Sequence, residues 1–105
     1  MTIISDVLIM RDIQISEIQI IPVKPKEGLV AFASCVINEF LYIGNIAVYT
    51  AMTTPGGYRL VYPSKILPNG KEINCVHPIN KKAGDLISQA ILSQFKTLVS
   101  NRIKE

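Results

Sequence analysis

Six polar side chains in the second half of the chain have the chemistry to bind a polyanion. Lysine and arginine place flexible positive charges beside phosphate oxygens, and the asparagine amide can donate to or accept from a base edge. The six residues are Arg59, Lys65, Asn69, Lys71, Lys81 and Lys82. We expect these residues to make up any nucleic-acid-binding surface of the protein.

The basic residues are unevenly distributed along the chain. The net charge is +3, but residues 1–57 carry three basic and five acidic side chains, whereas residues 58–105 carry eight and three. A basic half can bind a polyanion. The same excess of basic residues would arise if the lysines only made a sheet edge and a helix face soluble. Charge alone favours this simpler explanation. Asn69, Asn74 and Asn80 likewise suit turn, strand and cap positions.

Cys75 and His77 are the one pair that suggests catalysis or metal binding, because residues i and i+2 of a strand point the same way. A zinc site needs four ligands, and the chain has no second histidine and no Cys-x-x-Cys motif. We expect Cys75 to be a core residue and His77 to bond the backbone at the His-Pro corner. Ser64 has no nearby base in the sequence. The sequence thus predicts no enzyme, no catalytic residue, no metal and no cofactor.

Residues 63–80 contain the clearest turn in the sequence. Pro68, Asn69 and Gly70 fit a turn with proline at its first central position and glycine where a positive φ is needed. The flanking segments then predict a hairpin. Pro63 and Pro78 bracket it and should lie at strand ends or on an edge, since proline cannot donate to a ladder.

The composition predicts one domain with apolar surface that is buried against a partner. Apolar residues make up 49% of the 105 residues, and mean hydropathy is +0.32. No stretch reaches the ~20 apolar residues of a membrane span, and the start of the chain lacks a basic signal-peptide region. Two cysteines make no disulfide framework, which favours reduced thiols and a cytoplasmic protein.

Four β-strands are expected before the hairpin, at residues 13–23, 29–37, 40–49 and 58–62. Phase shifts predict bulges near Ser16-Glu17 and at Gly44-Asn45, and Pro22 and Pro25 should end the first strand. The second and third strands are apolar enough to be central and covered on both faces. The tyrosines suit base stacking, or more ordinary sheet cover and dimer contacts; they are Tyr42, Tyr49, Tyr58 and Tyr62.

Residues 1–14 are expected to be an N-terminal extension, and residues 15–105 the domain itself. The apolar residues of the extension are too clustered for a clean strand: Ile3, Ile4, Val7, Leu8, Ile9 and Met10. A short helical turn, an extra edge strand and an arm onto a second subunit all fit this pattern.

From Lys81 onward the pattern predicts an amphipathic helix with Asn80 as its N-cap. The apolar stripe consists of Ala83, Ile87, Ala90, Ile91, Phe95, Leu98 and Val99. Lys81 and Lys82 oppose the helix dipole, which costs about 0.3–1 kcal/mol each. A phosphate seat and a pair of salt-screened exposed lysines explain this placement equally well.

One helix can cover only one face of a sheet, so the other face needs a second copy of the chain. The sequence therefore predicts an α+β fold, a twisted antiparallel sheet of about five strands with a C-terminal amphipathic helix, assembled as a homodimer.

Seven short blocks between residues 15 and 98 resemble the stage V sporulation protein G (SpoVG) family of septation regulators. The most specific are Pro-Ser-Lys at residues 63–65, Pro-Asn-Gly at 68–70 and His-Pro-Ile-Asn at 77–80. The others are Ile-Ser-Glu-Ile at 15–18, Ala-Phe-Ala-Ser at 31–34, Asn-Glu-Phe at 38–40 and Ile-Ala-Val at 46–48. Residues 1–14 are additional to the usual family start.

The resemblance implies a small dimeric α+β protein, a bacterial cytosolic regulator of sporulation or septation that binds DNA and in some members RNA. The chain departs from the family where basic residues are common, with Ile66, Ile73 and Gly84 in their places. Lys71, Lys81 and Lys82 offset these losses.

Two functional hypotheses follow. The first is a homodimeric regulator that contacts DNA phosphates through the lysines of the hairpin and the helix start. The second is a protein-interaction module that engages another regulatory protein and has weak or lost DNA binding.

Overall fold

The strands and the helix follow the order expected for an α+β chain. The computed structural model describes residues 13–53 and 57–104. Its strands are β2 (Ile15–Lys26), β3 (Leu29–Ile37), β4 (Leu41–Thr50), β5 (Tyr58–Val61), β6 (Ser64–Ile66) and β7 (Glu72–Asn74), and its helix is α2 (Lys81–Lys104). Most of the expected N-terminal extension, residues 1–12, lies outside the described residues.

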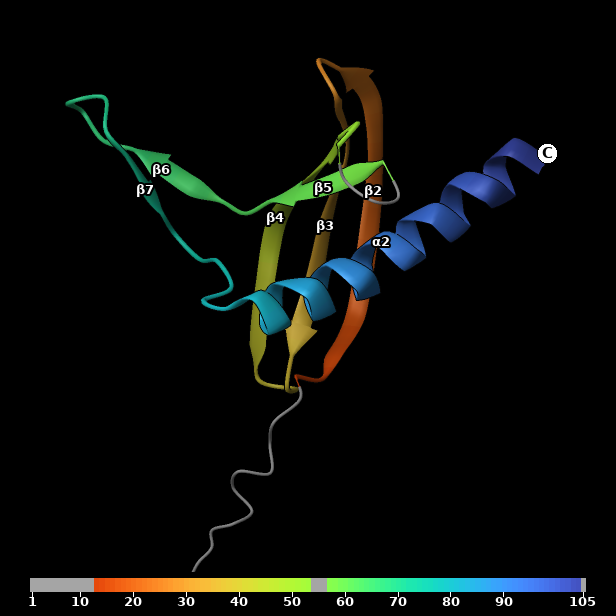
Figure 1. Ribbon diagram of the computed structural model, residues 1–105, viewed down its shortest axis with the longest axis horizontal. Coiled ribbons are helices and arrows are strands. Elements are labelled where there is room, and N and C mark those ends of the chain that lie inside the picture. Colours follow the sequence, from red (N-terminus) through yellow and green to blue (C-terminus); the bar gives the residue numbers. More distant parts are fainter. Residues whose placement is uncertain (1–12, 54–56, 105) are drawn as a thin grey trace, which may run out of the picture.

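The expected single sheet of about five strands is instead two separate sheets. Strands β2, β3, β4 and β5 pair as a four-stranded antiparallel sheet in chain order, and β6 and β7 pair only with each other. Pro63 lies where the chain leaves β5, and proline cannot donate the N–H that would continue the ladder. The β6–β7 hairpin therefore projects from the side of the molecule as an arm (Figure 1).

Both expected bulges are present. Glu17 has a φ of 48° at a register shift between β2 and β3, and Asn45 has a φ of 57° near a register shift between β3 and β4. The first strand does not end at Pro22 or Pro25, however, but continues to Lys26. Strand β2 lies at the edge of the sheet that the described strands form. A missing N–H there need not break a ladder hydrogen bond, and this explains why β2 tolerates both prolines.

The first two hairpin turns of the main sheet use residues with positive φ. Glu27 and Gly28 connect β2 to β3 with φ values of 53° and 91°. Asn38 and Glu39 begin the connection from β3 to β4 with φ values of 51° and 65°. Two central residues with positive φ match the right-handed twist of adjoining strands, which favours hairpins here. This second connection also includes Phe40, so β4 begins one residue later than expected.

The core lies between α2 and one face of the main sheet. Ile87, Ile91 and Phe95, at helical spacings of four, are buried against small residues of the central strand β3. These small residues are Ala31, Ala33 and Cys35. The helix crosses over the strands of the main sheet (Figure 1). No helix among the described residues is long and apolar enough to cross a membrane.

The opposite face of the sheet carries apolar side chains that nothing in the described chain covers with a second layer. Ile21, Phe32, Ala47 and Val61 pair in register across all four strands, so they share one face. Tyr42 lies on this face too, with its ring over Gly44, where a Cβ would be only 2.8 Å from the Tyr42 hydroxyl. We call these five side chains the open face. The expectation that β3 and β4 are covered on both faces is thus not met within one chain.

Tyr62 brings a polar group to the edge of the core. Its hydroxyl is buried and has no hydrogen-bond partner within residues 13–53 and 57–104. Burial and, to a lesser extent, the nearby Cys35 together raise the pKa of Tyr62 to about 12. Burial also raises the pKa of the Cys35 thiol.

Replacing Tyr62 with phenylalanine should remove a pH-dependent loss of stability. The unfolded tyrosine ionises near its ordinary pKa of 10.0, before the folded one. The stability due to this shift is therefore present below pH 10 and is lost as the pH rises toward 12. Urea unfolding at pH 8 to 11 should show a smaller decline for Tyr62→Phe than for the natural chain. Tyr42→Phe, which removes an exposed hydroxyl, is the control. Equal declines in all three proteins would contradict the burial of this hydroxyl.

Candidate nucleic-acid interface

The tip of the β6–β7 arm is a tight turn built by Pro68, Asn69 and Gly70. The N–H of Gly70 donates to the Leu67 carbonyl at 2.8 Å, and Gly70 has the expected positive φ of 87°. Asn69 Oδ1 accepts the N–H of Lys71 at 2.9 Å. The turn predicted from the sequence is confirmed. The carbonyl side of Asn69 is occupied by the turn, which leaves its amide NH₂ group to meet a ligand.

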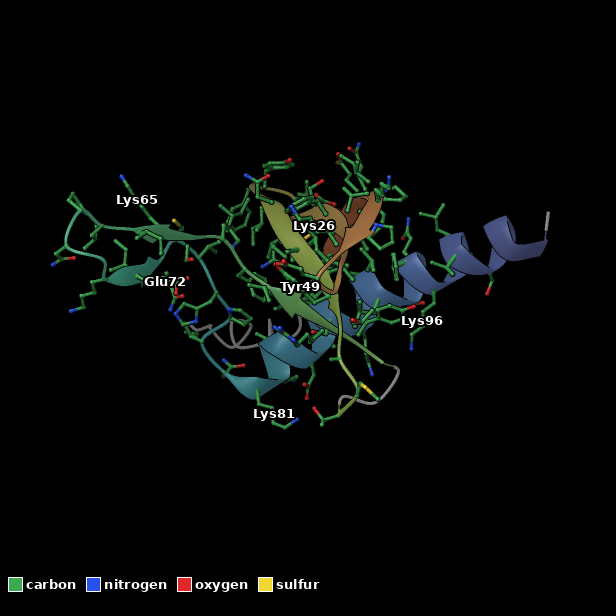
Figure 2. The ribbon with its side chains drawn as sticks, turned by 90° about the horizontal axis from the view of Figure 1, so that it is seen from above. Lys26, Tyr49, Lys65, Glu72, Lys81 and Lys96 are labelled. Atoms are coloured by element: carbon green, nitrogen blue, oxygen red, sulfur yellow. The ribbon has the colours of Figure 1, made fainter. Side chains whose placement is uncertain are left out.

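The two faces of the arm differ in charge. Lys65 pairs with Ile73, so these two residues share one face, and Ile66 pairs with Glu72 on the other. The Ser64 hydroxyl donates to the Glu72 carboxylate. This bond holds the acidic group on the face away from Lys65, and Figure 2 shows the two side chains on opposite sides of the arm. The positive charge of Lys65 is therefore not neutralised by its nearest acidic neighbour on the arm.

The start of α2 is capped as the sequence predicted. Asn80 Oδ1 accepts the N–H of Ala83 at 2.8 Å, and the Asn80 carbonyl accepts the N–H of Gly84 at 3.1 Å. Lys81 Nζ donates to Asp85 Oδ2 at 2.8 Å, one helical turn further on. Asp85 raises the pKa of Lys81, first through this hydrogen bond and then through its charge.

The ion pair with Asp85 affects how readily Lys81 can bind a phosphate. Both members of the Lys81–Asp85 pair are exposed, so water and salt screen their attraction and the pair adds little to stability. A phosphate would compete with Asp85 for Lys81. Lys82 is exposed beside it.

Arg59 lies apart from the lysines. It pairs with Tyr49 across β4 and β5, and its guanidinium carbon lies 5.0 Å from the centre of the Tyr49 ring. This is a cation–π contact. Arg59 is two residues from Val61 on β5, so the two side chains share a face of the strand. Arg59 therefore lies at the margin of the open face. Tyr49 is thus engaged by Arg59, while Tyr58 packs edge-on against Phe95 in the core with ring centres 4.9 Å apart.

The structure divides the six predicted residues among three places. Lys65, Asn69 and Lys71 lie on the arm, Lys81 and Lys82 at the helix start, and Arg59 on β5. Figure 2 shows Lys65 and Lys81 well separated and pointing to opposite sides of the molecule. Within one chain the lysines of the hairpin and of the helix start therefore do not face the same side of the molecule.

One further cation was not singled out from the sequence. Lys96 lines a groove between β5 and α2 together with Arg59 and Asp85. Its place on the polar arc of the helix is visible in the sequence. Only the crossing of the helix over β5 shows that it lies near Arg59.

The pair considered for catalysis is not a buried site. Cys75 is exposed, so the expectation that it belongs to the core is wrong. Strand β7 ends at Asn74, and Cys75 therefore lies on the arm's return path rather than over the sheet. His77 Nδ1 lies 2.9 Å from the Pro78 carbonyl oxygen and donates to it, which confirms the expected backbone bond. In the described chain no three His, Cys, Asp or Glu side chains gather in a way that could hold a metal ion.

Sequence comparison gives one clear match. A family model described as SpoVG matches residues 13–97, which include the main sheet, the arm and most of α2. No curated protein matches the chain.

Removing the cap at the helix start should destabilise the protein measurably. Asn80→Ala leaves the N–H of Ala83 without its side-chain acceptor, and loss of such a cap costs about 0.5–2 kcal/mol. Urea unfolding should show this loss, while Asn80→Ser, which restores an acceptor, should recover most of it. Asn101→Ala, on the exposed last turn of α2, is the matched control and should not destabilise. Equal stability of Asn80→Ala and the natural chain would contradict the cap.

Proposed function

The chain belongs to the SpoVG family of sporulation and septation regulators, and we propose that it performs this role as a homodimer that binds DNA. In this proposal the arm and the helix start contact phosphates, and the open face joins the two copies. The protein acts by binding, without a catalytic step.

The projecting arm is the observation that carries the DNA-binding proposal. A two-stranded β-ribbon has dimensions that fit the major groove of B-DNA. The arm extends beyond the sheet (Figure 1), and both Lys65 and Lys71 are exposed on it. Asn69 at its tip keeps an amide donor that can reach a base edge or a phosphate oxygen. The arm therefore supplies both charge and a hydrogen-bond donor at its outer end.

The helix start supplies a second cationic element. Lys81 and Lys82 lie beside the positive end of the α2 dipole, where a phosphate is favoured. Asp85 forms an ion pair with Lys81 in the free protein. A phosphate that binds Lys81 would replace Asp85 as its partner. The cost of exchanging one exposed partner for another is small, because both contacts are made in water.

The open face supports the proposed dimer. Ile21 is 63% exposed and Tyr42 is 69% exposed, although both are large apolar side chains on a regular sheet. Exposed apolar side chains of this size on one face of a sheet favour an interaction site. Pairing through the same patch on two copies gives a closed twofold dimer and doubles the number of arms. Arg59, at the margin of the patch, would then lie near the dimer boundary.

A second candidate function has its own supporting observation. The arm carries exposed apolar residues where the family often has basic ones: Ile66 is 63% exposed, and Ile73 is also exposed. Such residues suit a protein partner better than a phosphate. In this alternative the arm binds another regulatory protein and DNA binding is weak or lost.

Removing the two groups of lysines should flatten the salt dependence of DNA binding. The variants are Lys65→Ala with Lys71→Ala, and Lys81→Ala with Lys82→Ala. Every phosphate interaction that a variant removes should reduce the slope of log K against log salt by about 0.9 on duplex DNA. Binding to random duplex, single-stranded DNA and RNA at several salt concentrations measures the slope. RNA in the series tests whether RNA is the better ligand.

The matched control for this experiment is Lys24→Ala with Lys26→Ala, which removes the same charge from β2. The DNA-binding proposal predicts an unchanged slope for this control. Equal slopes for all three variants and the natural chain would contradict the assignment. Absence of any binding at low salt would favour the protein-interaction alternative.

Charges placed on the open face should dissociate the dimer. Ile21→Lys with Val61→Lys puts like charges at both edges of the face, and their repulsion and burial oppose pairing. Both residues are exposed in the single chain, so the fold should survive. Sedimentation should show a monomer. Met52→Lys, which changes a 99% exposed apolar residue elsewhere, should remain a dimer. A dimer that persists in the first variant would exclude this face as the interface.

A further inference from the structure

A groove beside the edge of the main sheet lacks an occupant among the described residues. It lies between the first half of β2 and the middle of α2 and has a volume of about 680 Å³. Most of its walls are Ile13, Ile15 and Ile18 of the β2 region and Leu86, Ala90 and Ser93 of α2. The helix residues follow a spacing of three and four, so they form one stripe.

The lining of the groove is uncharged. Besides the apolar side chains, only Gln89 and Ser93 contribute polar groups. Alanine and serine on the helix stripe are small, and this leaves room for side chains from another segment. A mainly apolar segment therefore suits the groove better than a charged one.

The groove also runs along a sheet edge. Strand β2 has twelve residues and pairs only with β3 among the described strands, so its outer backbone groups face away from the sheet. Long unprotected edges invite pairing with other chains, and proteins commonly cover them with a further segment.

The first described residue of the chain borders the groove. Ile13 is itself part of the wall. Gln14 is clamped to the β3–β4 turn, since its N–H donates to Asn38 Oδ1 at 2.9 Å and its carbonyl accepts the Asn38 N–H at 2.8 Å. The residues that precede Ile13 are therefore tethered directly at the groove and are present there at high effective concentration.

The length and composition of this preceding segment match the groove. Twelve residues precede Ile13, and an extended chain of that length spans roughly 40 Å. The wall from Ile13 to Ile18 along β2 spans only about 17 Å. Residues 7–10 are Val-Leu-Ile-Met, and Arg11-Asp12 separates them from Ile13, with an aspartate suited to a turn. The family match begins at residue 13, so this segment lies outside the part shared with the family.

We propose that residues 1–12 fold back onto their own chain, with residues 7–10 filling the groove between β2 and α2. The segment covers the outer edge of β2 and protects it from pairing with other chains. This surface is distinct from the open face and from the arm, so it serves neither the proposed dimer nor DNA binding.

A spin label on residue 8 tests which chain occupies the groove. Leu8→Cys is labelled in a Cys75→Ala background, because Cys75 is exposed whereas Cys35 is buried. Amide signals of residues 13–18 and 86–93 should lose more than half of their intensity, while those of the arm should not. A mixed sample of labelled, isotope-free chains and unlabelled, ¹⁵N-enriched chains then detects contacts between copies. Comparable broadening of the groove signals in the mixed sample, which would come from the segment of another copy, or no broadening of them in either sample, would overturn the proposal.

Hydrogen exchange on the full chain gives a second, independent measurement. Leu8→Asp with Ile9→Asp should raise the exchange rates of outer-edge amides of β2 by about tenfold or more, because the charged segment leaves the groove. Thr2→Asp with Ser5→Asp adds the same charge outside residues 7–10 and should leave these rates unchanged. Equal rates in both variants and the natural chain would also overturn the proposal.

Discussion

The packing of one helix on one face of the sheet is the constraint on which the rest of the structure depends. Ile87, Ile91 and Phe95 pack in one buried cluster with the short side chains of Ala31, Ala33 and Cys35 on β3. This contact fixes which side chains of every strand point inward. It also leaves the alternate side chains of the same strands on a face that no other helix of the described residues covers, and the apolar character of that face is why we infer a second copy.

The prolines separate the core from the surface proposed to bind a ligand. Pro63 takes the chain out of the main sheet, and Pro78 precedes the return to α2. Between them the arm has a sheet of its own, so its lysines and its exposed isoleucines can vary without disturbing the core. The balance of Lys65 and Lys71 against Ile66 and Ile73 is therefore independent of the packing of the core.

Local features were predictable from the sequence because local chemistry determines them. The turn at residues 67–70, the Asn80 cap and the bulges at Glu17 and Asn45 each follow from one or two residue types at fixed spacing. The departure of the hairpin from the main sheet was not predictable, because prolines are equally compatible with an edge strand. The exposure of Cys75 depended on that departure. The almost wholly apolar sequence of β3 likewise predicts that both faces of the strand are covered. It does not tell whether the same chain or another chain covers them. The six candidate residues could be named from the sequence, but their division among arm, helix start and β5 depends on tertiary structure.

The central claim is that the open face is buried against a second copy of the chain, and methyl NMR with a soluble paramagnetic probe tests it most directly. Ile91 is fully buried and Ile79 is 86% exposed, so these two residues calibrate the response within the same sample. At concentrations where the protein sediments as a dimer, the account predicts that the Ile21 methyl signals are protected nearly as well as those of Ile91. Ile21 signals that broaden like those of Ile79 under the same conditions would contradict it.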